Sequence, residues 1–114
     1  MHEVSIASGL IEIVSGQCEK NGYQRIDSVN VKIGRASGIM PDALVFAFDA
    51  MKSDSLAKDA VLYIEEVPVG GHCRDCNSDF SVEEEYILQC PRCGGLSFDV
   101  TAGREMDIVD MEVS

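Results

Sequence analysis

The most informative part of this chain is a pair of C-x-x-C motifs, Cys73-Arg74-Asp75-Cys76 and Cys90-Pro91-Arg92-Cys93. They hold four of its five cysteines, and the thirteen residues between them allow two short hairpins to gather four thiolates around one tetrahedral ion. The second motif continues into Gly94-Gly95, and glycine readily adopts the left-handed turn that points backbone N–H groups at sulfur. We therefore predict a structural zinc site. Iron stays an alternative because four thiolates suit both metals.

Redox chemistry and disulfides are two other uses of C-x-x-C motifs, and the sequence favours neither. A thioredoxin-like motif opens a helix, whereas no helical pattern follows Cys73. A secreted disulfide framework normally carries a signal peptide, but the first residues lack a basic segment with an apolar core. No apolar stretch is long enough to span a membrane. We expect a cytoplasmic location, where thiols stay reduced.

The length of the chain, 114 residues, allows one domain plus a small module. Pro68-Val69-Gly70-Gly71 is typical of a hinge, and the roughly thirty residues that follow are too few for a self-sufficient apolar core. We predict a first domain of residues 1–68 with 102–114, and an inserted zinc module of residues 69–101. The metal must replace the missing core, so the module should be disordered without it.

The net charge of −11 argues against nucleic-acid binding, because that function needs Lys and Arg to neutralise phosphates. Residues 1–36 are balanced, with four acidic and four basic side chains, whereas residues 37–114 hold sixteen acidic and five basic ones. Glu83-Glu84-Glu85 is the densest acidic run. Such a surface favours cations or a basic protein partner, although a merely soluble surface fits the same count.

Apolar periodicity predicts two helices in the first domain. The first should end near Asn21-Gly22, and the second should begin at Pro41, where Asp42 complements the helix dipole. The expected apolar face of the first helix consists of Ile6, Leu10, Ile13 and Val14. The expected apolar stripe of the second consists of Leu44, Val45, Phe48 and Met51.

Strands are predicted in three further segments of the first domain. Val29, Val31 and Ile33 alternate with polar residues, which indicates a strand with one buried face. Residues 60–67 are rich in Val, Tyr and Ile, and residues 106–113 return to the same sheet after the module.

The amino terminus carries a second chemical feature, because Met1-His2-Glu3 places an imidazole one residue from the α-amine. The amine, the amide nitrogen of His2 and its ring nitrogen can close fused rings around one ion in a plane. Square-planar nitrogen coordination suits Ni(II) or Cu(II), whereas zinc prefers a tetrahedron. An exposed histidine without a metal explains the same residue from the sequence alone.

These features together resemble the HypA/HybF family. The resemblance rests on Met-His-Glu at the start and on the paired cysteine motifs, and it spans the chain in order. It also includes the segments Pro41-Asp42-Ala43-Leu44, Phe46-Ala47-Phe48, Ile64-Glu65-Glu66-Val67-Pro68 and Gly103-Arg104-Glu105-Met106. Members deliver nickel to the large-subunit precursor of [NiFe]-hydrogenase with the GTPase HypB, and some serve urease maturation. The resemblance implies an α+β (α/β) fold, with two helices on a mixed three-stranded sheet and a four-cysteine, zinc-ribbon-like module.

The resemblance also implies which residues bind the metals. Nickel, as transient cargo, falls on Met1, His2 and Glu3, and Asp42 is a weaker candidate that could orient His2. Asp42 is equally explained as an acidic residue at a helix N-terminus. His72 could influence the zinc thiolates, although a solvated hinge residue is the simpler interpretation. Structural zinc falls on Cys73, Cys76, Cys90 and Cys93.

The predicted function is therefore that of a nickel metallochaperone and not of an enzyme. The sequence has no nucleophile elbow, phosphate-binding loop or zinc site with an open position. The expected partners are a HypB-type GTPase, the hydrogenase precursor and possible urease maturation proteins, with no nucleic acid and no membrane span, and the chain should be a monomer or homodimer. The alternative is an acidic zinc-ribbon adaptor that binds partner proteins without binding nickel.

Overall fold

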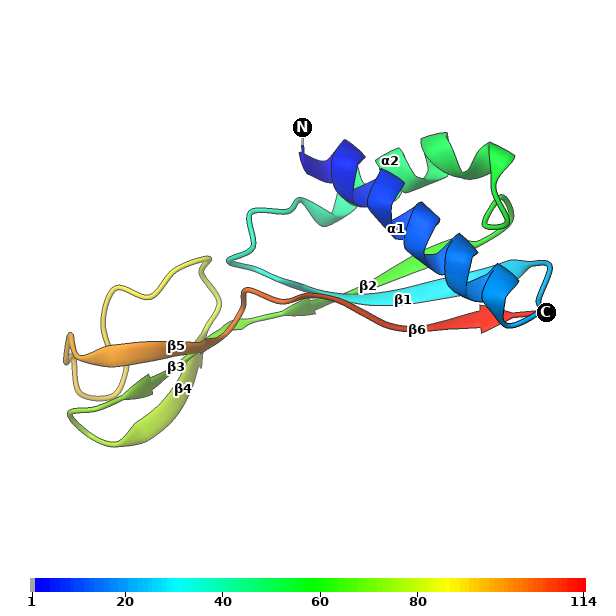
Figure 1. Cartoon of the computed structure of the whole chain (residues 1–114). Helices are drawn as coiled ribbons and strands as arrows, with labels where there is room; N and C mark the ends of the chain where they lie inside the picture. The colour runs from blue at the N-terminus through cyan, green and yellow to red at the C-terminus, as the bar shows by residue number, and fades with distance from the viewer. Residues whose placement is uncertain (1) are drawn as a thin grey trace. The chain divides into compact units, whose positions relative to one another are not determined.

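The structure is a computed structural model, and it describes residues 2–114. Two helices and six strands account for most of these residues, together with one short 3₁₀ helix (Figure 1). The elements in chain order are α1 (His2–Lys20), β1 (Ile26–Gly34), α2 (Pro41–Met51), η1 (Lys52–Asp54), β2 (Val61–Val67), β3 (Val69–Cys73), β4 (Ser78–Val82), β5 (Phe98–Ala102) and β6 (Met106–Val113).

Helix α1 ends at Lys20, next to the predicted Asn21-Gly22 terminator, where Gly22 has a φ of +80° and Tyr23 N donates to Cys18 O. Its predicted apolar face is only partly right. Ile13 is 56% exposed, and Ile6 is half-buried, because the buried face is rotated away from both. The buried residues of α1 are Ala7, Leu10, Ile11, Val14 and Cys18.

Helix α2 begins at Pro41, as predicted, because proline needs no hydrogen bond at the first helical position. Its buried face consists of Leu44, Ala47 and Phe48. Val45 is only half-buried and Met51 is 38% exposed, so two of the four residues of the predicted stripe lie at the edge of the buried face and not within it.

The first sheet has the strand order β2-β1-β6, and one of its faces is covered by α1 and α2 (Figure 1). Hydrogen bonds between Arg25 and Ser114 and from Gly34 N to Glu105 O set β1 antiparallel to β6. Ile26 N donates to Leu56 O before β2, and Arg35 N donates to Val67 O at its end, so β1 and β2 are parallel. This confirms the predicted fold class.

The predicted alternation of Val29, Val31 and Ile33 is also correct, because all three are buried. The largest fully buried side chains of the helices and of the first sheet are Phe48, Ile26, Leu44, Val14 and Val29. Cys18 is completely buried in α1, where it packs as a small apolar residue.

The second sheet has the order β4-β3-β5 and lies in the sequence between β2 and β6. Its central strand contains Val69, Gly70 and Gly71, so these three residues of the predicted hinge belong to a strand instead. Gly71 pairs with Phe80 of β4 on one side and with Val100 of β5 on the other. These glycines serve close packing in place of a flexible hinge: a Cβ on Gly71 would lie 2.8 Å from Phe80 Cζ and 3.0 Å from Asp99 O.

Contacts divide the chain into two compact units. One consists of Met1–Val31, Ile39–Glu65 and Asp107–Ser114, and the other of Lys32–Gly38 and Glu66–Met106. Residues 32–38 join the second unit through hydrogen bonds from Arg35 N to Val67 O, from Ala36 N to Gly103 O and from Arg35 Nη1 to Glu83 O. Independent folding of residues 69–101 stays a prediction. None of the helices in residues 2–114 is long and apolar enough to cross a membrane.

Candidate metal centres

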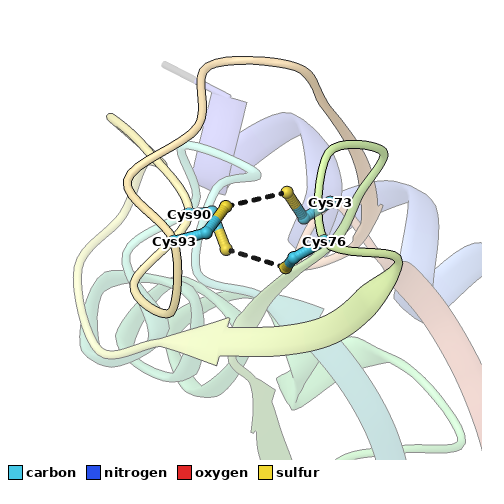
Figure 2. A group of neighbouring side chains, drawn as sticks. All are labelled: Cys73, Cys76, Cys90 and Cys93. Carbon is cyan, nitrogen blue, oxygen red and sulfur yellow. Dashed lines mark hydrogen bonds between the residues drawn. The ribbon is translucent and has the colours of Figure 1, made fainter.

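The four paired cysteines converge on one point in the second unit (Figure 2). All four sulfurs lie within 4.8 Å of one another, with 3.6 Å between Cys73 and Cys93 and 3.8 Å between Cys76 and Cys90. A disulfide needs an S–S distance near ~2.05 Å, and all four cysteines are free. Four sulfurs placed ~2.3 Å from a central zinc in a tetrahedron lie about 3.8 Å apart. The donor set therefore fits a structural Zn(II) ion.

The first motif is positioned by the turn between β3 and β4. Cys73 is the last residue of β3 and is fully buried, and Cys76 follows within the turn. Asn77 closes the turn with a φ of +56°, a left-handed conformation that asparagine tolerates better than most residues. The hairpin thus places both sulfurs on the same side.

The second motif is positioned by a tight loop that glycine makes possible. Cys90 N donates to Gly95 O at 2.9 Å, and Gly94 N donates to Cys90 O at 2.8 Å. Gly94 has a φ of +74°, which confirms the left-handed turn predicted after the second motif. Gly95 N then donates to Cys93 Sγ at 3.4 Å, which stabilises a thiolate there.

The cysteines disturb one another's ionisation. The backbone N–H of Cys93 is the main cause that lowers the pKa of the Cys90 thiol to about 7. The pKa of Cys93 rises to about 12: the N–H of Gly95, its largest single influence, lowers it, but the neighbouring thiols, Cys73 first, together with burial, outweigh that effect. Thiols this close cannot all ionise without a compensating charge. A divalent cation supplies that charge, because a thiol that coordinates it is deprotonated.

Few apolar side chains are buried around the thiols, as expected for a module of this size. Phe80 and Phe98 meet edge to face with ring centroids 6.3 Å apart, and both rings are only half-buried. Leu88 and Leu96, which flank the second motif, are 75% and 76% exposed. The apolar contribution to folding is thus limited, and metal coordination would supply much of the stability.

His72 is not a solvated hinge residue, because both of its ring nitrogens have partners. Nδ1 lies 2.7 Å from Asp79 Oδ1, and Nε2 lies 3.1 Å from Asn77 Oδ1. The bond to Asp79 is the main cause that raises the pKa of His72 above its ordinary value. Nothing in the sequence indicated this arrangement, because Asn77 comes from the turn and Asp79 meets His72 only through the pairing of β3 with β4.

Two of the candidate nickel residues, His2 and Glu3, lie at the start of α1. Met1 is outside the described residues. His2 is the first residue of the helix, its side chain is 70% exposed, and its Nε2 lies 3.7 Å from Glu3 Oε2. The same oxygen of Glu3 accepts a hydrogen bond from Met40 N at 3.3 Å. The sequence analysis missed this contact, and no local pattern signals it, because the two residues are 37 positions apart.

Asp42 is exposed in the first turn of α2 and, in the described chain, makes no hydrogen bond or ion pair with His2 or Glu3. Its place in the second helical position is explained by the positive end of the helix dipole. The contact between the two helix starts is made by Glu3 instead.

Fold and site together define a small α+β metal-binding protein with a four-cysteine module. The family model described as "Hydrogenase/urease nickel incorporation, metallochaperone, hypA" matches residues 1–113. The chain belongs to the HypA family, as the sequence resemblance predicted.

The relatives agree over nearly the full chain. A "Hydrogenase maturation factor HypA" from Geotalea daltonii is 40% identical over 113 residues, and the match covers 99% of both chains. The protein of the same name from Rhizobium leguminosarum bv. viciae is 39% identical over 113 residues, with the same coverage.

Two solved structures share the fold. "Solution structure of HypA protein" superposes with a TM-score of 0.73 at 31% identity, covering 100% of this chain and 97% of that one. "Solution structure of the Ni metallochaperone HypA from Helicobacter pylori" gives a TM-score of 0.66 at 31% identity, covering 97% and 96% of the two chains.

Proposed function

We propose that this protein binds Ni(II) at its amino terminus and delivers it to the large-subunit precursor of [NiFe]-hydrogenase. The observation that carries the proposal is the full-length match to a family described by nickel incorporation, in a chain whose first residues are Met-His-Glu. Nickel is cargo in this function, so the protein transfers an ion and catalyses no reaction.

The proposed nickel ligands are the amine of Met1, the backbone and ring nitrogens of His2, and Glu3 through its backbone or carboxylate. The helical position of His2 supports this choice, because the first N–H groups of a helix have no intrahelical partner. The amide of His2 is therefore not held in a helical hydrogen bond, and its nitrogen can bind a square-planar ion once its proton has passed to solvent. Asp42 is a weaker candidate for an outer position.

Two features of this site favour release over tight storage. The positive end of the α1 dipole disfavours a cation nearby, by about 0.3–1 kcal/mol at an exposed site. The exposed His2 side chain also lets an incoming ligand approach the ion directly. The first effect weakens the site and the second speeds exchange, and a delivery protein needs both.

The proposed role of zinc is structural. Cys73, Cys76, Cys90 and Cys93 would hold Zn(II), whose chemistry there is to neutralise thiolates and cross-link the loops of the second unit. With four protein ligands the site has no open position for catalysis.

The proposed partners are the hydrogenase precursor and a HypB-type GTPase, with a further role in urease maturation. We place the function in the cytoplasm, where four reduced thiols persist. The acidic surface of residues 37–114 supports a basic protein partner over nucleic acid.

The test is a nickel titration, by calorimetry and absorption, of zinc-loaded protein that begins at Met1. We expect one planar nickel site per chain, absent in His2→Ala with zinc content and fold unchanged. A matched control places extra residues before Met1, which removes the free amine and should abolish the site while His2 is retained. Equal nickel binding by all three forms would overturn the proposed site and favour an acidic zinc-ribbon adaptor.

A further inference from the structure

Phe46 is an apolar side chain that the fold does not use. It is 77% exposed, more than any other large apolar side chain in residues 2–114. Its neighbour in the Phe-Ala-Phe segment, Phe48, is completely buried. A single exposed apolar residue is ordinary, so its surroundings decide whether it has a function.

Helix geometry places Phe46 opposite the packed face of α2. At about 100° per residue, the buried residues Leu44, Ala47 and Phe48 lie on one side, and Phe46 projects from the other. Asp42 and Asp49 lie on the same outward side, one turn before and one turn after it. We name this surface, formed by Asp42, Phe46 and Asp49, the outer face of α2.

The charge of the outer face selects the kind of occupant. Asp42 and Asp49 are both exposed, and the last turn of α2 contains no basic residue. Lys52, which follows the helix, pairs with Asp49 at 2.9 Å and also donates to Ala60 O, so it offsets part of the charge of Asp49 and none of the charge of Asp42, ten residues earlier. A second copy of the chain would bring aspartates against aspartates. An apolar pocket bordered by Lys or Arg is complementary to this face.

The helix that carries the outer face begins at a contact with one of the proposed nickel ligands. Met40 N, at the start of α2, is hydrogen-bonded to Glu3, and Phe46 lies about 9 Å farther along the helix axis. Met40 is 66% exposed and Val4, which follows Glu3, is 42% exposed. Two exposed apolar side chains, Met40 and Val4, therefore adjoin Glu3, one through the hydrogen bond of Met40 N and the other in sequence.

From these observations we infer that the outer face of α2 is the docking surface for the nickel acceptor, a protein with an apolar pocket rimmed by basic side chains that receives Phe46. This inference rests on the proposed function. Docking here would place the acceptor on the helix whose start is hydrogen-bonded to Glu3 and would exclude water from the exposed apolar side chains of Met40 and Val4 during transfer. Aromatic residues seated in pockets commonly dominate such interfaces.

The experiment measures the affinity of zinc-loaded protein for the purified [NiFe]-hydrogenase large-subunit precursor by calorimetry, without nickel. We expect Phe46→Ala to weaken binding by at least about tenfold and Phe46→Leu to restore most of it. Asp49→Lys should weaken binding further at low salt than at high salt, because it places a positive charge against a basic rim. Phe46→Ala leaves the fold intact, since the side chain is exposed and alanine favours a helix.

The matched control is Tyr63→Ala. Tyr63 is a 56% exposed aromatic residue of β2, and it points away from the helices because its neighbour Leu62 is buried. This variant should bind the precursor as the unsubstituted protein does. Each variant is also titrated with nickel, and all should retain the nickel site.

Precursor affinity unchanged by Phe46→Ala would overturn the inference, as would an equal loss in Tyr63→Ala, or no binding by the unsubstituted protein. If Phe46→Ala instead weakens only self-association or only binding of the GTPase, the occupant is wrong and the inference fails. If the unsubstituted protein bound no nickel, the proposed function would be contradicted. The affinity for the precursor is measured without nickel, so it would still test the docking surface.

Discussion

The carboxylate of Glu3 accepts a hydrogen bond from the backbone N–H of Met40, with 3.3 Å between Oε2 and N. This contact joins the first turn of α1 to the start of α2, where the N-cap residue has no hydrogen bond from its own side chain. His2 Nε2 lies 3.7 Å from the same oxygen. The same oxygen of Glu3 thus connects the two helices and lies beside His2, a proposed nickel ligand.

The first prediction concerns the acid titration of Glu3. Two backbone N–H groups lower the pKa of the Glu3 carboxyl below its ordinary value: that of Met40, which has the larger effect, and that of Glu3 itself. The contact therefore contributes fully above the unfolded-state pKa and is lost as the pH falls through the lowered folded-state value. NMR should show the Met40 amide shift changing together with Glu3 protonation.

In Glu3→Gln the same Met40 amide should show no acid transition, because the amide side chain does not titrate in this range. A Glu3 carboxyl that titrates at or above its ordinary pKa would contradict the prediction.

The second prediction concerns metal removal. Because residues 69–101 contain few buried apolar side chains, chelation should unfold them while α1 and α2 keep their helical circular-dichroism signal. Structural zinc supplies roughly 10–16 kcal/mol in comparable small sites. Selective loss of amide signals from residues 69–101 in NMR spectra would agree with this, and joint melting of both units would refute it.

The third prediction compares two glycines. In α1, a Cβ added to Gly16 meets nothing within 4 Å, so Gly16→Ala should stabilise the helix by up to ~1 kcal/mol. In β3, a Cβ on Gly71 would contact Phe80, Asp99 and Ile87 at 3.0 Å or less, so Gly71→Ala should cost about 1–3 kcal/mol.

Helical circular dichroism in urea measures the first of these effects, and zinc-thiolate absorbance measures the second. Gly16→Ala and Gly71→Ala control for each other, because a general effect of alanine would change both in the same direction. Destabilisation by both substitutions would contradict the prediction for Gly16.

The fourth prediction concerns His72. Its pKa is raised, chiefly by the hydrogen bond to Asp79, so the bond stabilises the fold below the unfolded-state pKa and is lost as the pH rises through the folded-state value. Asp79→Asn should lower the pKa of His72, measured by NMR in the zinc-loaded protein. Asp99→Asn is the matched control, because Asp99 faces His72 from β5 but has a smaller influence. An equal shift in both variants would exclude the Asp79 hydrogen bond as the main cause.

The sequence predicted much of the fold because the signals are local. The spacing Cys73–Cys76 and Cys90–Cys93, the glycines after it, Pro41 at a helix start and the alternation from Val29 to Ile33 each act over a few residues. It misassigned Ile13 and Val45, since periodicity gives the angle of an apolar stripe only to within about one residue. It misread Gly70-Gly71 as a hinge because glycine is compatible with a flexible turn and with close strand packing alike.

Local patterns were enough to predict the four-thiol centre and the order of the helices and strands of the first domain, because covalent spacing and turn chemistry fix both, whereas strands β3, β4 and β5 were not predicted. Three features emerged only from the folded chain: Glu3 bonds Met40, His72 is held by Asp79 and Asn77, and Phe48 is buried while Phe46 is exposed. Such contacts depend on which faces of distant elements meet when the core packs, and no local pattern encodes that choice.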